Sequence, residues 1–348
     1  MTIRAIRRLR GLARGLTNMF MPPALILLYH RVTELPSDPQ LLCVSRQHFA
    51  EHLEILRKHG RPMRLQELTK TLQNGSSLRR RIVVTFDDGY ADSLLNARPL
   101  LERYETPATV FVTSGYVGQE REFWWDELDR LFLQDGKLPD ALRIVINGHT
   151  HEWHLGAPAD CSQHSHRGDG TWNVEEKRDP APRQRVYRSL CDLLRPLPER
   201  DQRTILETLV AWAGVERVCR PTHRPLRPHE VFQLAAGGLV EVGSHTLTHP
   251  VLSGLPEATQ RYEIERSKAQ LEEMVGQPVG SFAYPYGTRS DYTTQTVVAV
   301  RAAGFDRACS NFAGTVRRGS DPWQLPRFLV RDYDGEEFAR RLEQWLAE

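Results

Sequence analysis

Two adjacent carboxylates follow a strand-like apolar run in the stretch RIVVTFDDGYADS, residues 81–93. Each of Asp87 and Asp88 raises the cost of ionising the other, so the pair needs a positive group nearby. Farther along the chain, His245 and His249 are four residues apart, and one helical turn would place both imidazoles on the same side. Two neutral imidazoles and one carboxylate form a three-ligand site that suits zinc and leaves a position open. We therefore expect one aspartate to bind a divalent metal ion, with zinc as the expected ion, and the other to act as a base.

Polar groups stand at the ends of four strand-like segments, VTFDDG, GSHTLTH, FAYPYG and LPRFLVRD. In parallel α/β architectures the C-terminal ends of the strands are where catalytic groups converge. Taken alone, an Asp-Asp pair after a strand is more often the start of a helix, and two histidines four apart on a loop are often structural. Their occurrence at successive strand ends favours the metal site.

Strand-like and helix-like segments alternate over most of the chain, which predicts a parallel sheet or barrel. The helix after Ser45 has that residue as its N-cap and Gly60 as its stop. The expected strands are 24–32, 82–86, 108–118, 238–245, 281–287, 306–310 and 326–331. The expected helices are 45–60, 92–104, 228–236, 256–275, 291–303 and 335–347.

The alternation is interrupted between residues 119 and 230. The stretch FWWDELDRLFL predicts a helix, and two strand-like runs around Asn147-Gly148 predict a hairpin. Two further helices are expected near 183–195 and 199–213. We interpret residues 119–230 as a large α+β insertion carried by the barrel, rather than as a separate catalytic domain.

The composition is that of a soluble globular protein, with 40% hydrophobic and 26% charged residues in a chain of 348. A net charge of +2 argues against a dedicated nucleic-acid binder, so no nucleic-acid partner is expected. The five cysteines include no Cys-x-x-Cys pair, which favours a reducing compartment. No apolar run of about 18 residues is present that would span a membrane.

The first twenty residues combine five arginines with no acidic residue, and a helix here would separate the arginines from an apolar face. A basic amphipathic helix over residues 1–20 can contact an anionic membrane surface. Docking on the chain's own domain or a frayed terminus is an equally good interpretation, and an organellar transit peptide is a weaker one. The absence of a clear signal peptide predicts a cytoplasmic protein, or one peripheral to the cytoplasmic face of the membrane.

The motifs around these carboxylates and imidazoles resemble those of the polysaccharide deacetylases with the NodB homology domain, carbohydrate esterase family 4. The resemblance covers roughly residues 24–118 and 228–331. TFDDGY resembles the first motif, which implies Asp87 as general base and Asp88 as metal ligand. SHTLTH resembles the second motif, which implies His245 and His249 as the other ligands. YPYG resembles the third motif, which implies that the backbone N–H of Tyr286 stabilises the oxyanion.

This resemblance implies a distorted (β/α)7 barrel over residues 24–348, interrupted by the insertion. It also implies a metal-dependent N-deacetylase that hydrolyses the acetamido group of an N-acetylated sugar in a polysaccharide, or in a glycan or glycan-lipid precursor. Two alternatives remain open: a hydrolase of another small amide or cyclic imide on the same barrel, and a non-catalytic carbohydrate-binding relative. Trp124 and Trp125 would either stack on a sugar ring or, as is more frequent, pack in a helix core.

Two positions depart from the family pattern. Ala283 stands where the third motif usually has an arginine, and Leu325-Pro326-Arg327 stands where the last motif has Leu-x-His, the histidine being the general acid. The acid is then expected to be His30 or a histidine of the insertion. Arg327 or Arg331 is expected to replace the missing arginine in orienting Asp87.

Overall fold

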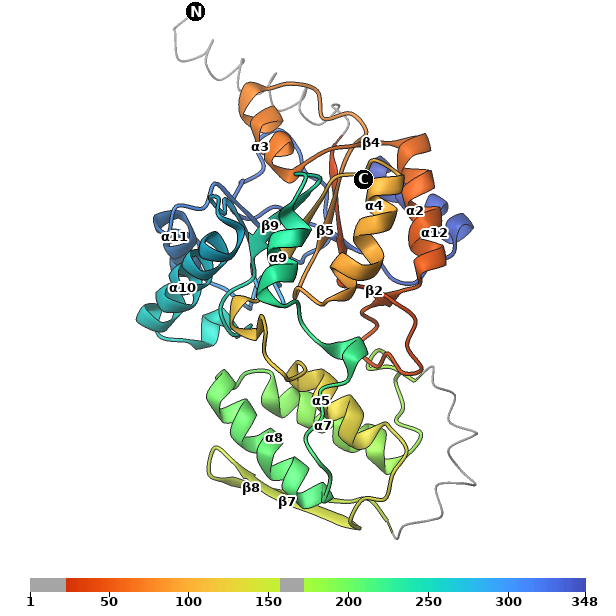
Figure 1. Ribbon diagram of the computed structural model, residues 1–348, viewed down its shortest axis with the longest axis vertical. Coiled ribbons are helices and arrows are strands. Elements are labelled where there is room, and N and C mark those ends of the chain that lie inside the picture. The colour runs from red at the N-terminus through yellow and green to blue at the C-terminus, as the bar shows by residue number, and fades with distance from the viewer. Residues whose placement is uncertain (1–22, 157–171) are drawn as a thin grey trace, which may run out of the picture.

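A sheet of parallel strands forms the centre of the computed structural model, which describes residues 23–156 and 172–348 (Figure 1). The expected helix at residues 1–20 lies outside these residues. The strand order is β11-β10-β9-β6-β5-β1-β12, with β4 paired to β5 off this path. All of these pairings are parallel. A parallel bridge between Cys309 and Leu325 links β11 to the segment before β12. The sheet therefore curves into a distorted parallel barrel, as predicted.

The strands of this sheet are β1 (Leu25–Tyr29), β4 (Arg61–Pro62), β5 (Arg81–Phe86), β6 (Ala108–Val112), β9 (Val240–Ser244), β10 (Ser281–Ala283), β11 (Arg307–Cys309) and β12 (Phe328–Leu329). Strands such as β1, LILLY, and β6, ATVFV, are buried at every position. Continuous apolar runs are typical of parallel strands that are covered on both faces. A separate short pair joins β2 (Arg31–Val32) to β3 (Cys43–Val44).

Helices pack around this sheet, and all except α3 bury their apolar faces in one large cluster with the strands, whereas α3 packs in a smaller cluster. They are α2 (Arg46–His59), α3 (Leu65–Asn74), α4 (Arg98–Arg103), α9 (Pro228–Ala235), α10 (Glu257–Val275), α11 (Thr294–Ala302) and α12 (Gly335–Ala347). Ser45 caps α2 by accepting a hydrogen bond from the His48 amide, and Gly60 ends the helix, as predicted. Short turns of helix are η1 (Ser93–Ala97), η2 (Ser114–Tyr116), η3 (Pro221–His223) and η4 (Leu252–Gly254).

The structure differs from the sequence-based expectations in several places. Helix α3 was not predicted, and the predicted helix at 92–104 begins with the π-helical turn η1 before α4. The strand expected over 108–118 ends at Val112 and is followed by the helical turn η2. The strand expected over 281–287 ends at Ala283. Pro285 has no backbone N–H to continue the hydrogen-bond ladder of the sheet, and Tyr286 has a positive φ of 58°. The chain therefore leaves the sheet early and forms a loop over the strand ends.

A second body lies below the barrel in Figure 1 and has its own apolar cluster. It contains α5 (Trp124–Phe132), the hairpin of β7 (Ala141–Ile146) and β8 (His149–His154), α7 (Pro182–Leu194) and α8 (Glu199–Ala213). The predicted helices and hairpin are found here, and Asn147 and Gly148 both have the positive φ that a tight hairpin turn requires. The assignment of residues 119–230 as an insertion into the barrel stays a prediction.

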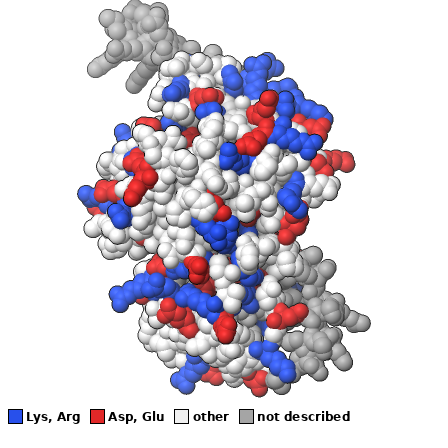
Figure 2. All heavy atoms as spheres, viewed as in Figure 1, with Lys and Arg blue, Asp and Glu red and all other residues white. Residues whose placement is uncertain are grey.

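Basic and acidic side chains are interspersed over both bodies on the face shown in Figure 2. Among the described residues, no helix combines the length and the apolar character needed to cross a bilayer.

Candidate active site

Asp88, His245 and His249 meet at the C-terminal ends of β5 and β9. The Asp88 Oδ1 atom lies 3.4 Å from His249 Nε2 and 3.6 Å from His245 Nε2. One ligand atom from each residue lies within 4.8 Å of the others, and all three side chains are buried. Two imidazoles and one carboxylate are a donor set for zinc or a similar divalent ion, with positions left for water or substrate. The residues present therefore fit a catalytic metal ion.

The two histidines meet for a different reason from the one the spacing suggested. Residues 245–249 form no helical turn, because Thr246 and His249 have positive φ values of 65° and 62°. The Thr246 hydroxyl accepts a hydrogen bond from the His249 amide at 3.0 Å. Glu263 of α10 accepts two more from the amides of Leu247 and Thr248. A strained loop, held by α10, therefore brings the two rings to a centroid distance of 4.9 Å.

Backbone contacts fix the ligand atom of His245. Its Nδ1 lies 2.8 Å from the Ala283 carbonyl oxygen, which can only accept, so Nδ1 carries the proton and the lone pair of Nε2 faces the space among the three ligand residues. Burial lowers the pKa of His245 to about 4, so the ring is neutral at pH 7. Burial alone would raise the pKa of Asp88, but the neighbouring His249 has the larger, opposite effect, and the pKa is lowered to about 2. Both residues are therefore in the protonation state that a metal ion requires.

The second aspartate is held by an arginine that directly precedes β12, a strand separated from β5 only by β1. Arg327 Nη1 and Nη2 donate to the two carboxylate oxygens of Asp87, each at 2.7 Å. The same guanidinium donates to the Ser310 carbonyl and the Thr85 hydroxyl, and its side chain is fully buried. Burial raises the pKa of Asp87, while Arg327 lowers it below its ordinary value, so the carboxylate stays ionised.

Of the two arginines expected to orient Asp87, the structure therefore assigns this contact to Arg327. Arg331 instead donates to the Leu41 carbonyl and to Glu175.

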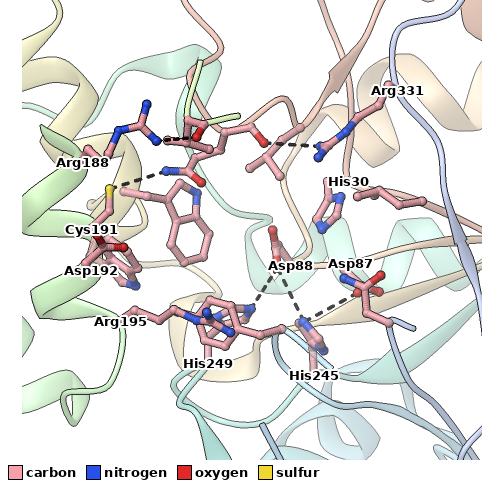
Figure 3. Close-up of a pocket in the computed structure, with 18 residues that line it drawn as sticks. His30, Asp87, Asp88, Arg188, Cys191, Asp192, Arg195, His245, His249 and Arg331 are labelled. Carbon is pink, nitrogen blue, oxygen red and sulfur yellow. Dashed lines mark hydrogen bonds and ion pairs between the residues drawn. The ribbon is translucent and has the colours of Figure 1, made fainter. Parts of the chain in front are cut away.

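A cleft of about 470 Å³ opens over these groups, between the barrel and the second body (Figure 3). Asp87, Asp88, His245 and His249 line the cleft at the strand ends, and Arg188, Cys191 and Asp192 of α7 line it from the second body, while Arg195 at the C-cap of α7 reaches toward His249. Helix α7 therefore forms part of the cleft that opens over Asp88.

Trp124 and Trp125 line the same cleft and are also 5% and 6% exposed members of the second core. The Trp125 ring packs edge-on against His249 at 5.1 Å. Core packing is thus confirmed for both tryptophans, and stacking on a sugar ring stays a prediction.

His30 follows β1 and lines the cleft beside Asp87 and Asp88 (Figure 3). Burial lowers its pKa, and the two carboxylates partly oppose that shift. Three histidines of the second body, His149, His151 and His154, lie on the hairpin strand β8 and do not line this cleft. His164 and His166 lie outside the described residues.

Tyr286 lies on the cleft wall next to the ligands, with its ring 4.8 Å from that of His249. The sequence analysis did not identify Arg195, which contacts Tyr286 from α7. No local motif surrounds Arg195, and its partners lie about ninety residues away, so nothing short of the fold could have identified it.

The comparisons with known proteins agree with this geometry. A family model described as "Polysaccharide deacetylase" matches residues 74–175 and 206–307, together more than half of the chain. The poly-beta-1,6-N-acetyl-D-glucosamine N-deacetylase of Staphylococcus aureus is 27% identical over 144 residues, which are 38% of this chain and 49% of that protein. The Bacillus subtilis protein YxkH is 27% identical over 108 residues, 30% of this chain and 37% of its own length. The chain therefore aligns with less than half of the length of each of these two relatives.

Solved deacetylases share the fold over nearly the whole chain. The Streptococcus pyogenes deacetylase PplD, in complex with acetate, has a TM-score of 0.57 at 15% identity and covers 94% of this chain and 99% of its own. IcaB from Ammonifex degensii has a TM-score of 0.57 at 22% identity and covers 94% and 98%. At these identities the likeness establishes the fold, a distorted deacetylase-type barrel.

Proposed function

Because the chain belongs to the polysaccharide deacetylase family, whose members are hydrolases of carbon–nitrogen amide bonds, we propose that it is a metal-dependent N-deacetylase of an N-acetylated sugar in a polysaccharide or glycan precursor. The observation that carries the proposal is the buried Asp88, His245 and His249 cluster next to a second carboxylate, Asp87, that an arginine holds in place. The name of the Staphylococcus aureus relative supports N-acetylglucosamine as the first sugar to test.

In this proposal Asp88, His245 and His249 hold the divalent ion, which when bound would polarise the acetamido carbonyl and lower the pKa of a water. Asp87 accepts a proton from the attacking water, and Arg327 keeps its carboxylate in position. The water oxygen adds to the carbonyl carbon. The backbone N–H of Tyr286 donates to the developing oxyanion. The carbon–nitrogen bond then breaks, and acetate and the protonated sugar amine leave.

His30 is the proposed general acid: because burial lowers its pKa, the ring first takes up the proton that Asp87 removes from the water and then delivers it to the leaving nitrogen. Three histidines line the cleft among the described residues, and two of them, His245 and His249, are the proposed ligands. Arg327 occupies the position of the family histidine but remains protonated, and it donates to Asp87, Ser310 and Thr85. His30 is the remaining cleft histidine, and it lies beside both aspartates.

Metal content and acetate release test this proposal together. The purified protein is analysed for bound metal and then incubated with β-1,6- and β-1,4-linked N-acetylglucosamine oligomers, with and without chelator. We expect close to one ion per chain, and acetate release that chelator and the Asp88→Ala substitution both abolish. Bound metal with turnover of a cyclic imide but not of any glycan would favour the other hydrolase. Absence of metal after reconstitution would refute the catalytic proposal and leave a carbohydrate-binding protein.

We also propose that residues 1–20 contact an anionic membrane surface and hold the enzyme at the cytoplasmic face, near a glycan-lipid substrate. The five arginines of this segment support the proposal. Sedimentation with vesicles of phosphatidylglycerol and phosphatidylcholine is expected for the full chain. Equal sedimentation after deletion of residues 1–20 would contradict it.

A further inference from the structure

Arg195, at the C-cap of α7, joins the second body to the loop that follows β10. Its guanidinium carbon lies 4.5 Å above the centre of the Tyr286 ring. Its Nη2 donates to Asp291 Oδ1 at 2.8 Å. A single side chain of the second body thus contacts this loop at two points, five residues apart.

Asp291 is itself a fixed partner. Its side chain is 6% exposed, and its other carboxylate oxygen accepts hydrogen bonds from the amide and the hydroxyl of Thr288. Its carbonyl accepts a further hydrogen bond from the Ser253 amide. The ion pair therefore attaches Arg195 to a turn that is already closed, so movement of the arginine is resisted by the barrel.

Tyr286 needs such support because its backbone is strained. Its φ of 58° lies in the left-handed region, which is uncommon for a residue with a side chain and costs free energy unless surrounding contacts enforce it. The ring is enclosed by Arg195 on its face and by His249 at 4.8 Å. Of these two neighbours, Arg195 belongs to the second body.

We propose that Arg195 is a positioning residue through which the second body holds the Tyr286 backbone N–H at the oxyanion position. The inference rests on the proposed deacetylase function and gives the second body a part in the chemical step. The cation–π contact fixes the ring of the strained residue, and the ion pair fixes the turn that follows it, so the direction of the N–H depends on Arg195. Without the arginine, Tyr286 is free to relax and the N–H turns away from the developing charge.

The test compares Arg195→Gln with the conservative Arg195→Lys and with the matched control Arg203→Gln. Arg203 is an arginine of the same body, on α8, whose ion pair with Glu207 is exposed and which does not line the cleft. Loss of one complete oxyanion donor lowers kcat by about 10²–10³-fold, so a displaced donor is expected to cost on the order of tenfold. We expect Arg195→Gln to lower kcat by about that factor with little change in KM, and Arg195→Lys to recover part of the loss.

Two further measurements separate positioning from a general loss of structure. The defect of Arg195→Gln should shrink for N-trifluoroacetyl substrates, because their oxyanion is less basic and needs less hydrogen bonding. Hydrogen exchange should become faster in peptides covering residues 284–292 for Arg195→Gln and stay unchanged for Arg203→Gln. An unchanged kcat, or a defect of equal size for acetyl and trifluoroacetyl substrates, would overturn the proposal.

Failure of the proposed function has a different signature. If the wild-type protein releases no acetate, the deacetylase proposal fails and the oxyanion role of Arg195 fails with it, whatever the exchange data show. If the wild type is active and exchange in residues 284–292 does not respond to Arg195→Gln, the deacetylase stands and only the positioning role is refuted.

Discussion

Substitution of Arg327 by methionine should show how strongly the proposed base depends on its partner. Arg327 and Asp87 are 1% and 4% exposed, and two hydrogen bonds of 2.7 Å join them. Removing one member of a buried ion pair leaves the other charge without compensation, at a cost of about 3–5 kcal/mol. Asp87→Asn should be costly for the same reason. In the double variant neither charge remains, so we expect its cost to fall short of the sum of the single costs by about 3 kcal/mol.

Urea unfolding of the four proteins in the presence of chelator measures this coupling without a contribution from bound metal. Arg331→Met is the matched control, because Arg331 lines the same cleft but contacts Leu41 and Glu175, and we expect it to cost less than about 1 kcal/mol. In acetate release, Arg327→Met should lower kcat on the order of 10²-fold, since the carboxylate is no longer held toward the water. Single costs that add within about 0.5 kcal/mol, together with unchanged kcat, would refute the role given to Arg327.

Three other predictions concern the metal, the acid and the pH dependence of stability. Asp88→Ala should reduce bound metal from about one ion per chain to near zero, by elemental analysis, with an unchanged circular dichroism spectrum. His30→Gln should lower kcat on the order of 10²-fold for sugar substrates and much less for an acetanilide with a good leaving group; equal losses would contradict the acid role. Burial lowers the pKa of His52 to about 4. The stability tied to its neutral form is therefore complete above the unfolded-state pKa of about 6.5 and is lost as pH falls toward 4. We expect about 2 kcal/mol of loss between about pH 8 and about pH 5, measured by urea unfolding; a His52→Gln protein with the same pH dependence would contradict this.

The sequence predicted the residues of the site because parallel strands bring their C-terminal ends to one edge. Asp87 and Asp88 follow an expected strand, His245 is the last residue of another, and Tyr286 lies near the end of a third, and the sheet places all four around one cleft. This reasoning needs only the direction of the strands, which their apolar runs and the intervening helices indicate. The hairpin at Asn147-Gly148 was predictable for a similar local reason, since its turn requires residues that tolerate positive φ.

Features set by tertiary contacts were not predictable in this way. The spacing of His245 and His249 suggested a helical turn, whereas hydrogen bonds that Glu263 of α10 accepts from backbone amides shape a strained loop. The choice between Arg327 and Arg331 could not be made from the sequence, because both lie in the same strand-like segment, LPRFLVRD. Only the pairing of β12 with β1 shows which arginine reaches into the barrel toward Asp87.

The two departures from the family pattern are connected through the barrel interior. Ala283 is fully buried in an apolar cluster that includes Phe111, and the Arg327 guanidinium lies 5.6 Å from the centre of that same Phe111 ring. An arginine at 283 would bring a second buried cation toward the Asp87 carboxylate, which Arg327 already binds. The chain would then have to bury two positive charges with a single negative partner. A small residue at 283 is therefore what an arginine at 327 requires. The Ala283 carbonyl still orients His245, since that contact needs only the backbone. The segment before β12 supplies the orienting arginine at position 327, where the family pattern has its histidine. The proposal therefore assigns the general acid to His30, which lines the same cleft.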